Sequence, residues 1–149
     1  MGPIMRFLKH TGCAMAGVVL SAGSTLAMAE VVVVVASASP VKTLAGSQVA
    51  NIFLGKTNRF PDGGQAVPID LPEGSAIRDE FYTRFTGKSA AQLKAHWSKI
   101  IFTGRGQPPE TLGSSAEVKK YLAGHPDSVG YIDARDVDDS VRVLPADPP

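Results

Sequence analysis

Residues 31–36 form an unbroken β-branched run, Val-Val-Val-Val-Val-Ala. β-Branched side chains favour strands, and a run with no polar alternation is typical of a strand buried on both faces. Such a strand needs a covering layer on each side of its sheet. The run therefore predicts a central strand in a sheet that has helices on its faces.

Patterns typical of strands alternate with patterns typical of helices along the rest of the chain. Ser89 and Ser114 are each followed three residues later by Gln or Glu, which predicts a capping box at a helix start. This alternation predicts an α/β fold built on parallel β-α-β units, with a central, mostly parallel sheet flanked by helices. The expected strands are 31–36, 66–71, 128–132 and 141–144, and the expected helices begin at Ser47, Ser75, Ser89 and Ser114. Pro68 cannot donate to a ladder, which favours a sheet edge or a strand start at that position.

Apolar residues at helical spacing define the inward face of each expected helix. These residues are Val49, Ile52 and Phe53 in the first helix, Ile77, Phe81 and Phe85 in the second, Leu93, Trp97 and Ile100 or Ile101 in the third, and Val118, Tyr121 and Leu122 in the fourth. Trp97 is therefore expected in the core rather than on an open platform.

Residues 1–29 have the three parts of a secretory signal peptide. Arg6 and Lys9 give a positive start, an apolar stretch of small residues follows, and Ala27-Met28-Ala29 is a small-x-small cleavage pattern. A retained membrane anchor is the competing interpretation, but the apolar part is short and interrupted by polar residues. The prediction is export to the periplasm or beyond with cleavage after Ala29, a domain over 30–144 and a disordered tail over 145–149.

Charge and cysteine content restrict what the exported part can do. The only cysteine, Cys13, lies in the predicted signal peptide, so no disulfide is expected in the domain. Without Arg6 and Lys9, the 15 basic residues of the chain fall to 13, against 14 acidic ones. A near-neutral chain of this kind is a poor partner for nucleic acid or for an anionic membrane surface. No membrane insertion of the mature chain is expected.

The segment from Asp70 to Phe81 reads as strand, turn and helix. Backbone N–H groups and the positive end of the helix dipole meet at such a junction, which suits an anion. Gly74, Ser75 and Ala76 would supply N–H groups, Ser75 its hydroxyl and Arg78 a charge-assisted contact. The alternative is an ordinary helix start, in which Ser75 is the N-cap and the acidic residues of the first turns satisfy the dipole.

Two other basic elements are weaker candidates for an anion site. Arg105 stands between Gly104 and Gly106, so the backbone there can approach a ligand, although a mobile surface loop explains the pattern equally well. Lys56, Thr57 and Arg59 follow the first expected helix and are typical of a solvated loop.

Motifs of enzymes and metal sites are missing from the sequence. It contains no G-x-S-x-G, Walker or H-E-x-x-H motif, and His96 and His125 do not have the spacing of metal ligands. The aspartates between 133 and 139 lack the Gly and the terminal Glu of an EF-hand loop. A protein with no catalytic activity, no metal and no cofactor is predicted.

Three segments resemble the phosphate-binding proteins of ABC uptake systems. Residues 52–63 are similar to the I-F-x-G-K-x-x-x-W-x-D-G segment of that family, residues 73–81 to its S-G-T-x-x-x-F helix start, and residues 123–132 to its P-G-A-I-G-Y strand. The resemblance implies one lobe of a type II periplasmic binding protein. It implies only one because 149 residues less 29 leave 120, whereas the family closes two lobes on its ligand.

The resemblance also implies a ligand and its contacts. In the family, an Arg before the Ser-Gly-Thr turn grips the phosphate, and the hydroxyls of the turn donate to it. Here Asp70 stands where that Arg is expected, and Ala76 takes the place of the Thr. A carboxylate near a bound phosphate is useful only where it accepts the remaining proton of the anion.

Two functions remain open on this basis. The first is a periplasmic module that binds phosphate or a similar oxyanion through Gly74, Ser75, Ala76 and Arg78, with Asp70 and Arg105 nearby, and that delivers it to a membrane transporter. The second is an accessory protein, not involved in transport, that uses the exposed face of its single lobe for docking to another periplasmic protein or for dimerisation. A large exposed apolar patch would favour the second.

Overall fold

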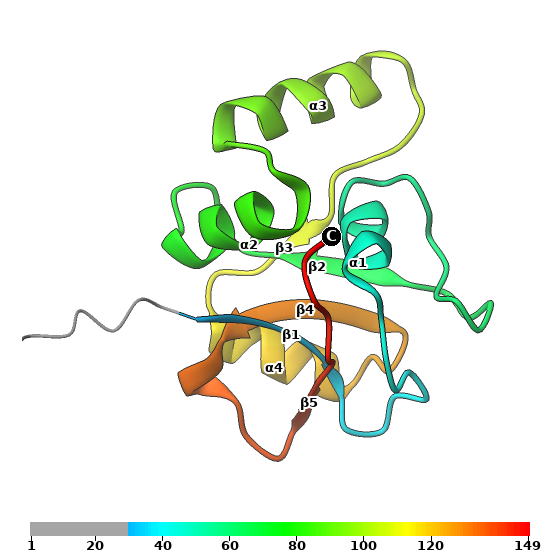
Figure 1. The fold of residues 1–149 in the computed structure, drawn as a ribbon, viewed down its shortest axis with the longest axis vertical. Helices are drawn as coiled ribbons and strands as arrows, with labels where there is room; N and C mark the ends of the chain where they lie inside the picture. The colour runs from blue at the N-terminus through cyan, green and yellow to red at the C-terminus, as the bar shows by residue number, and fades with distance from the viewer. Residues whose placement is uncertain (1–29) are drawn as a thin grey trace, which may run out of the picture.

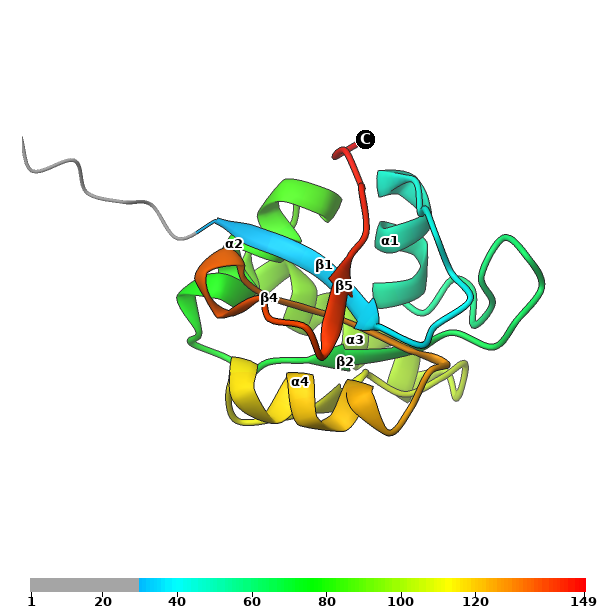
Figure 2. The same ribbon diagram turned by 90° about the horizontal axis from the view of Figure 1, so that it is seen from below.

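A computed structural model describes residues 30–149, which form a five-stranded sheet with helices on both faces (Figure 1). Helices α1 and α2 lie on one face and α4 on the other (Figure 2). The strands are β1 (Val31–Ala36), β2 (Val67–Asp70), β3 (Glu110–Thr111), β4 (Ser128–Asp133) and β5 (Val141–Val143); the helices are α1 (Gly46–Phe53), α2 (Ala76–Thr86), α3 (Ala90–Phe102), α4 (Ser115–Ala123) and the short 3-10 turn η1 (Ala134–Asp136).

The strand order is β3-β2-β4-β1-β5. β2 is parallel to both β3 and β4, whereas β1 is antiparallel to both of its neighbours, β4 and β5. Four strands therefore point one way and β1 points the other, which confirms the mostly parallel α/β fold. The apolar pattern of β1 does not reveal its reversed direction, because a strand buried on both faces has the same pattern whichever way it runs.

The valine run is confirmed as a central strand. β1 lies between β4 and β5, with Val33 opposite Tyr131 and Val35 opposite Val129. All of its residues except Val32 are buried, so both faces of the strand contribute to the core.

Serine caps begin three of the four helices, as predicted. The Oγ atoms of Ser75, Ser89 and Ser114 accept the backbone N–H of the residue three positions on, in α2, α3 and α4. Helix α1 is different: it begins at Gly46 with Ala45 as N-cap, and not at Ser47. The Gln48 side chain explains the shift, because its Oε1 accepts the Ala45 N–H at 2.8 Å and so fixes the cap two residues earlier.

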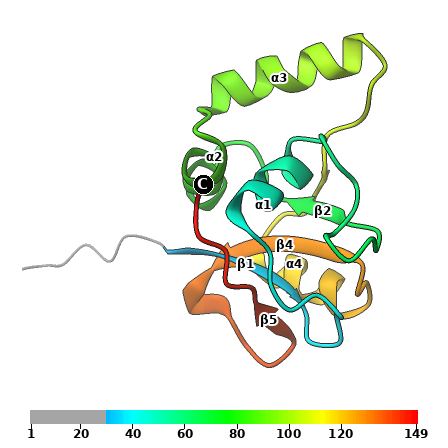
Figure 3. The same cartoon turned by 45° about the vertical axis from the view of Figure 1, so that its right-hand side comes forward.

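Helix α3 lies apart from the sheet, beyond the other helices (Figures 1 and 3). Leu93 and Trp97 are buried, as the spacing predicts, and of the two isoleucines it is Ile100 that packs against the core. Ile101 is 52% exposed and Phe102 93% exposed at the end of the helix.

Pro68 is accommodated inside the sheet because β3 is very short. β3 pairs only with Ile69 and Asp70, so Pro68 faces a ladder partner on the β4 side alone, where it is opposite Val129. β3 itself was not predicted, since a strand of two exposed residues has no apolar pattern to reveal it.

The predicted signal peptide, residues 1–29, lies outside the described residues. Residues 145–149, for which the sequence predicts a disordered tail, form no helix or strand, and Ala146 packs against the core. Among residues 30–149, no helix is both long and apolar enough to cross a bilayer.

Candidate anion-binding site

The start of α2 lies directly after the carboxyl end of β2. Ser75 is in an extended conformation as N-cap, and Gly74 before it has a φ of 91°, a value that disfavours any residue with a Cβ. The Oγ atom of Ser75 accepts the Arg78 N–H at 3.4 Å, which leaves its own proton free to be donated. Gly74 and Ala76 are exposed, so the first-turn N–H groups can reach a ligand in solvent.

Asp70 is the buried centre of this junction. Its Oδ2 atom accepts the Tyr82 hydroxyl at 2.8 Å. Its Oδ1 atom accepts the Leu71 N–H at 2.8 Å and the Tyr131 hydroxyl. A carboxylate out of contact with water is stable only where donors surround it in this way. The last residue of β2 is thus tied to α2 and to β4.

Arg78 links the buried carboxylate to the surface. Its Nε lies 3.4 Å from Oδ1 of Asp70, and its guanidinium stands over the Tyr82 ring at 5.2 Å from the ring centroid. The side chain is 14% exposed. Its two terminal nitrogens have no hydrogen-bond partner among residues 30–149, so they are available to an oxyanion at the start of α2.

Aromatic rings pack behind the carboxylate. The Phe81 ring stacks on the Tyr131 ring with centroids 4.0 Å apart, and Phe53 meets Phe81 edge to face at 4.7 Å. Burial raises the pKa of the Tyr82 and Tyr131 hydroxyls well above the ordinary value of 10.0, and the charge of Asp70 raises both further.

Because the pKa of these two hydroxyls is raised, we expect a distinctive titration of the protein at alkaline pH. Their pKa is higher in the folded than in the unfolded chain, so the stability they contribute is complete below about pH 10 and is lost as the pH rises above that value. In an absorbance titration of the native protein, we expect only the half-buried Tyr121 to ionise before unfolding. Tyr82 and Tyr131 should ionise together with the loss of the far-ultraviolet circular dichroism signal. Three tyrosines that ionise while the fold persists would contradict the described hydrogen bonds.

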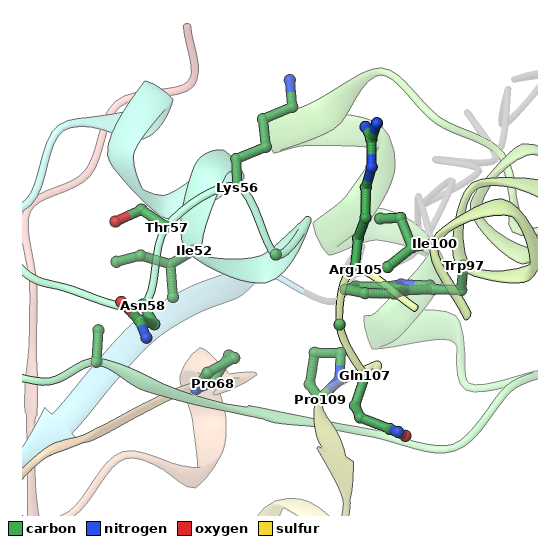
Figure 4. Close-up of a pocket in the computed structure, with 13 residues that line it drawn as sticks. Ile52, Lys56, Thr57, Asn58, Pro68, Trp97, Ile100, Arg105, Gln107 and Pro109 are labelled. Carbon is green, nitrogen blue, oxygen red and sulfur yellow. The ribbon is translucent and has the colours of Figure 1, made fainter. Parts of the chain in front are cut away.

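The structure brings together Asp70, Gly74, Ser75, Ala76 and Arg78, but it does not bring Arg105 to them. Arg105 lies after α3 and lines a separate pocket of about 340 Å³ with Lys56, Thr57 and Trp97 (Figure 4). No residue from Asp70 to Arg78 lines that pocket.

The acidic residues near η1 are engaged in local contacts. Asp133 accepts from the Arg135 guanidinium, which lowers the pKa of its carboxyl. Asp138 accepts from Lys119 Nζ at 2.7 Å and from Ser140, which lowers its pKa to about 2. Residues 30–149 contain no group of three or more His, Cys, Asp or Glu side chains placed to hold a metal ion.

Sequence reasoning did not identify Tyr82 and Tyr131 as partners of Asp70. Tyr82 stands four residues after Arg78 and so shares its helix face, a spacing that could have suggested the contact. Tyr131 lies 61 residues from Asp70 in the chain, and no local pattern connects them.

Several solved structures with a similar fold are described as proteins of phosphate transport. A protein described as a phosphate ABC transporter substrate-binding protein from Clostridium perfringens, with bound phosphate, is 23% identical with a TM-score of 0.63, and the match covers 79% of this chain and 45% of that one. An ABC-type phosphate transport receptor from Vibrio cholerae is 19% identical with a TM-score of 0.62, over 79% of this chain and 46% of that one. PstS from Borrelia burgdorferi is 14% identical with a TM-score of 0.58, over 79% and 47%.

The comparison confirms the fold that the three segments predict. The chain spans less than half the length of each of these structures, which agrees with one lobe of a type II periplasmic binding protein. No protein-family model and no curated protein matches the sequence.

Proposed function

We propose that the chain, once exported, is a non-enzymatic binding module that holds phosphate or a similar small oxyanion at the start of α2. The observation that carries this proposal is the position of Arg78, fixed by Asp70 beside exposed first-turn N–H groups. The backbone N–H groups of Gly74 and Ala76 and the Ser75 hydroxyl would donate to the anion; the Ser75 N–H, expected as a further donor, instead donates to the Pro72 carbonyl at 3.1 Å. The terminal nitrogens of Arg78 would add charge-assisted hydrogen bonds. Periplasmic location and delivery to a membrane transporter are parts of the same proposal.

Asp70 has two effects on such a ligand. It orients Arg78, which favours binding, but its negative charge opposes that of the anion. Because Asp70 already accepts from two tyrosines, it acts as a positioning residue and does not contact the ligand in this proposal. The site is also open to water, which screens each charged hydrogen bond. We therefore expect weak binding, with a Kd of about 1 mM, or roughly −4 kcal/mol.

Calorimetric titration of residues 30–149 with phosphate and with sulfate at low ionic strength tests the proposal. Arg78→Gln should reduce phosphate affinity at least about tenfold, because a charge-assisted hydrogen bond is lost. Ser75→Ala should weaken binding by a smaller factor, because it removes the donated hydroxyl and, with it, the oxygen that accepts the Arg78 N–H as N-cap. Arg84→Gln is the matched control, since Arg84 lies in the last turn of the same helix. Absence of heat with about 10 mM phosphate, or equal affinities for Arg78→Gln and Arg84→Gln, would contradict the proposal.

One observation favours docking to a protein partner as a second function. Ile101 and Phe102 stand exposed at the end of α3, the helix that lies farthest from the sheet. A phenylalanine exposed to this degree contributes apolar area that water solvates poorly. Sedimentation of the protein with and without Phe102→Ala would test self-association: a dimer that dissociates on substitution supports docking between copies, and a monomer in both samples contradicts it.

A further inference from the structure

Two depressions join between the end of α1 and the side of α3, away from the start of α2. Their volumes are about 340 Å³ and 440 Å³, within the range of small-molecule sites. They share Gly55, Lys56, Ile100 and Arg105, so they form one continuous surface feature, here called the basic groove. The segment 103–109, which follows α3, forms one wall.

Positive charge gathers in the basic groove without counter-ions. Lys56, Lys99 and Arg105 line it together with His96, and none of the lining residues is acidic. The ion pairs among residues 30–149 involve Arg78, Lys119 and Arg135, so the three cations of the groove have no partner of this kind. Like charges placed close together repel, and a bound anion would relieve that repulsion.

An apolar wall lies below the charged rim. Ile52, Pro68, Trp97 and Pro109 line the smaller depression (Figure 4). Gly55 permits this arrangement: its φ is 73°, and a Cβ at this position would lie 2.8 Å from Cη2 of Trp97. Only a residue without a side chain lets the loop approach the indole so closely.

Polar groups of the groove occupy distinct places. Lys56 and Arg105 extend toward the same side of the pocket, above the apolar wall, in Figure 4. The amides of Asn58 and Gln107 line the smaller depression. Charge at the rim, an apolar wall and two amides together match a ligand with an anionic group at one end and a flat, mainly apolar body.

We propose that the basic groove binds a small organic anion, namely a phosphate or carboxylate group carried on a flat apolar body. The anionic group contacts Lys56, Lys99 and Arg105, and the body lies against Pro68, Pro109 and the small part of Trp97, 6% of the residue, that is exposed. This site is separate from the start of α2 and uses none of its residues.

Trp97 is the only tryptophan in the chain, so its fluorescence reports on this groove. Phenyl phosphate is the probe. Inorganic phosphate and phenol, which each carry one half of the probe, are the controls. We expect a saturable change of Trp97 emission with phenyl phosphate below about 10 mM, and an affinity at least about tenfold higher than that of either half. No saturable change, together with no calorimetric heat over the same range, would overturn the proposal.

Variants locate the bound anion. Lys99→Gln and Arg105→Gln should each weaken phenyl phosphate binding about fivefold, a loss that reflects partial screening at an exposed rim. Lys94→Gln is the matched control, because Lys94 is an exposed lysine of α3 that does not line the groove. Arg78→Gln should leave the binding unchanged, which separates this proposal from the one for α2. Equal affinities of Arg105→Gln, Lys99→Gln and the unaltered protein would overturn it.

Discussion

Replacing Asp70 with alanine should lower the free energy of unfolding by about 3–5 kcal/mol, because several buried donors lose their acceptor at once. The hydroxyls of Tyr82 and Tyr131 lie in the core with Asp70 as their common partner. Neither can reach water without disturbing α2 or β4. The Leu71 N–H also loses its contact with the Asp70 carboxylate.

Urea unfolding followed by circular dichroism measures this effect. Tyr82→Phe and Tyr131→Phe are the controls, and each should lower stability by only about 1 kcal/mol, since each removes a donor and leaves the carboxylate with others. Asp70→Asn should fall between these values, because the amide keeps one acceptor oxygen. A loss below about 1 kcal/mol for Asp70→Ala would show that the buried carboxylate does not organise the junction.

Phe81→Ala should lower the free energy of unfolding by as much as Asp70→Ala does, about 3–5 kcal/mol. Phe81 has no exposed surface and stacks on Tyr131, with Phe53 at its edge and Phe85 at a centroid distance of 5.1 Å. Removal of the ring leaves a cavity between α2 and the sheet that these neighbours can fill only partly. The same cavity loosens Tyr131, and through it Asp70.

Phe102→Ala is the matched control for this substitution. The two residues are identical in type, but Phe102 is 93% exposed, so its loss should change stability by less than about 0.5 kcal/mol. Similar losses in both variants, measured by urea unfolding, would mean that Phe81 does not lie in the core as described.

Local sequence patterns predicted most of the helices and strands, because helix capping and strand propensity are local properties. The valine run identified β1, and the serine caps identified the starts of α2, α3 and α4. The reversed direction of β1 and the pairing of β3 depend on contacts between distant segments. Burial and capping contain no information on those contacts.

The sequence predicted the position of the candidate site but not the contacts within it. The start of α2 and the residues from Gly74 to Arg78 follow from the cap and the strand before it. Asp70 was considered as a group that could face the anion, whereas in the structure it is buried among Tyr82, Tyr131 and Arg78. That role depends on β4 and α2 meeting at the end of β2, which tertiary packing alone decides.

Amide chemical shifts test most directly whether the start of α2 binds an oxyanion. A ¹H–¹⁵N spectrum of residues 30–149 should be followed as phosphate is raised to about 20 mM at constant ionic strength. If an oxyanion binds there, we expect saturable shifts at the amides of Gly74, Ala76 and Ile77. Shifts that fail to saturate, or that gather around Gly55 and Gly104 instead, would contradict binding at this site.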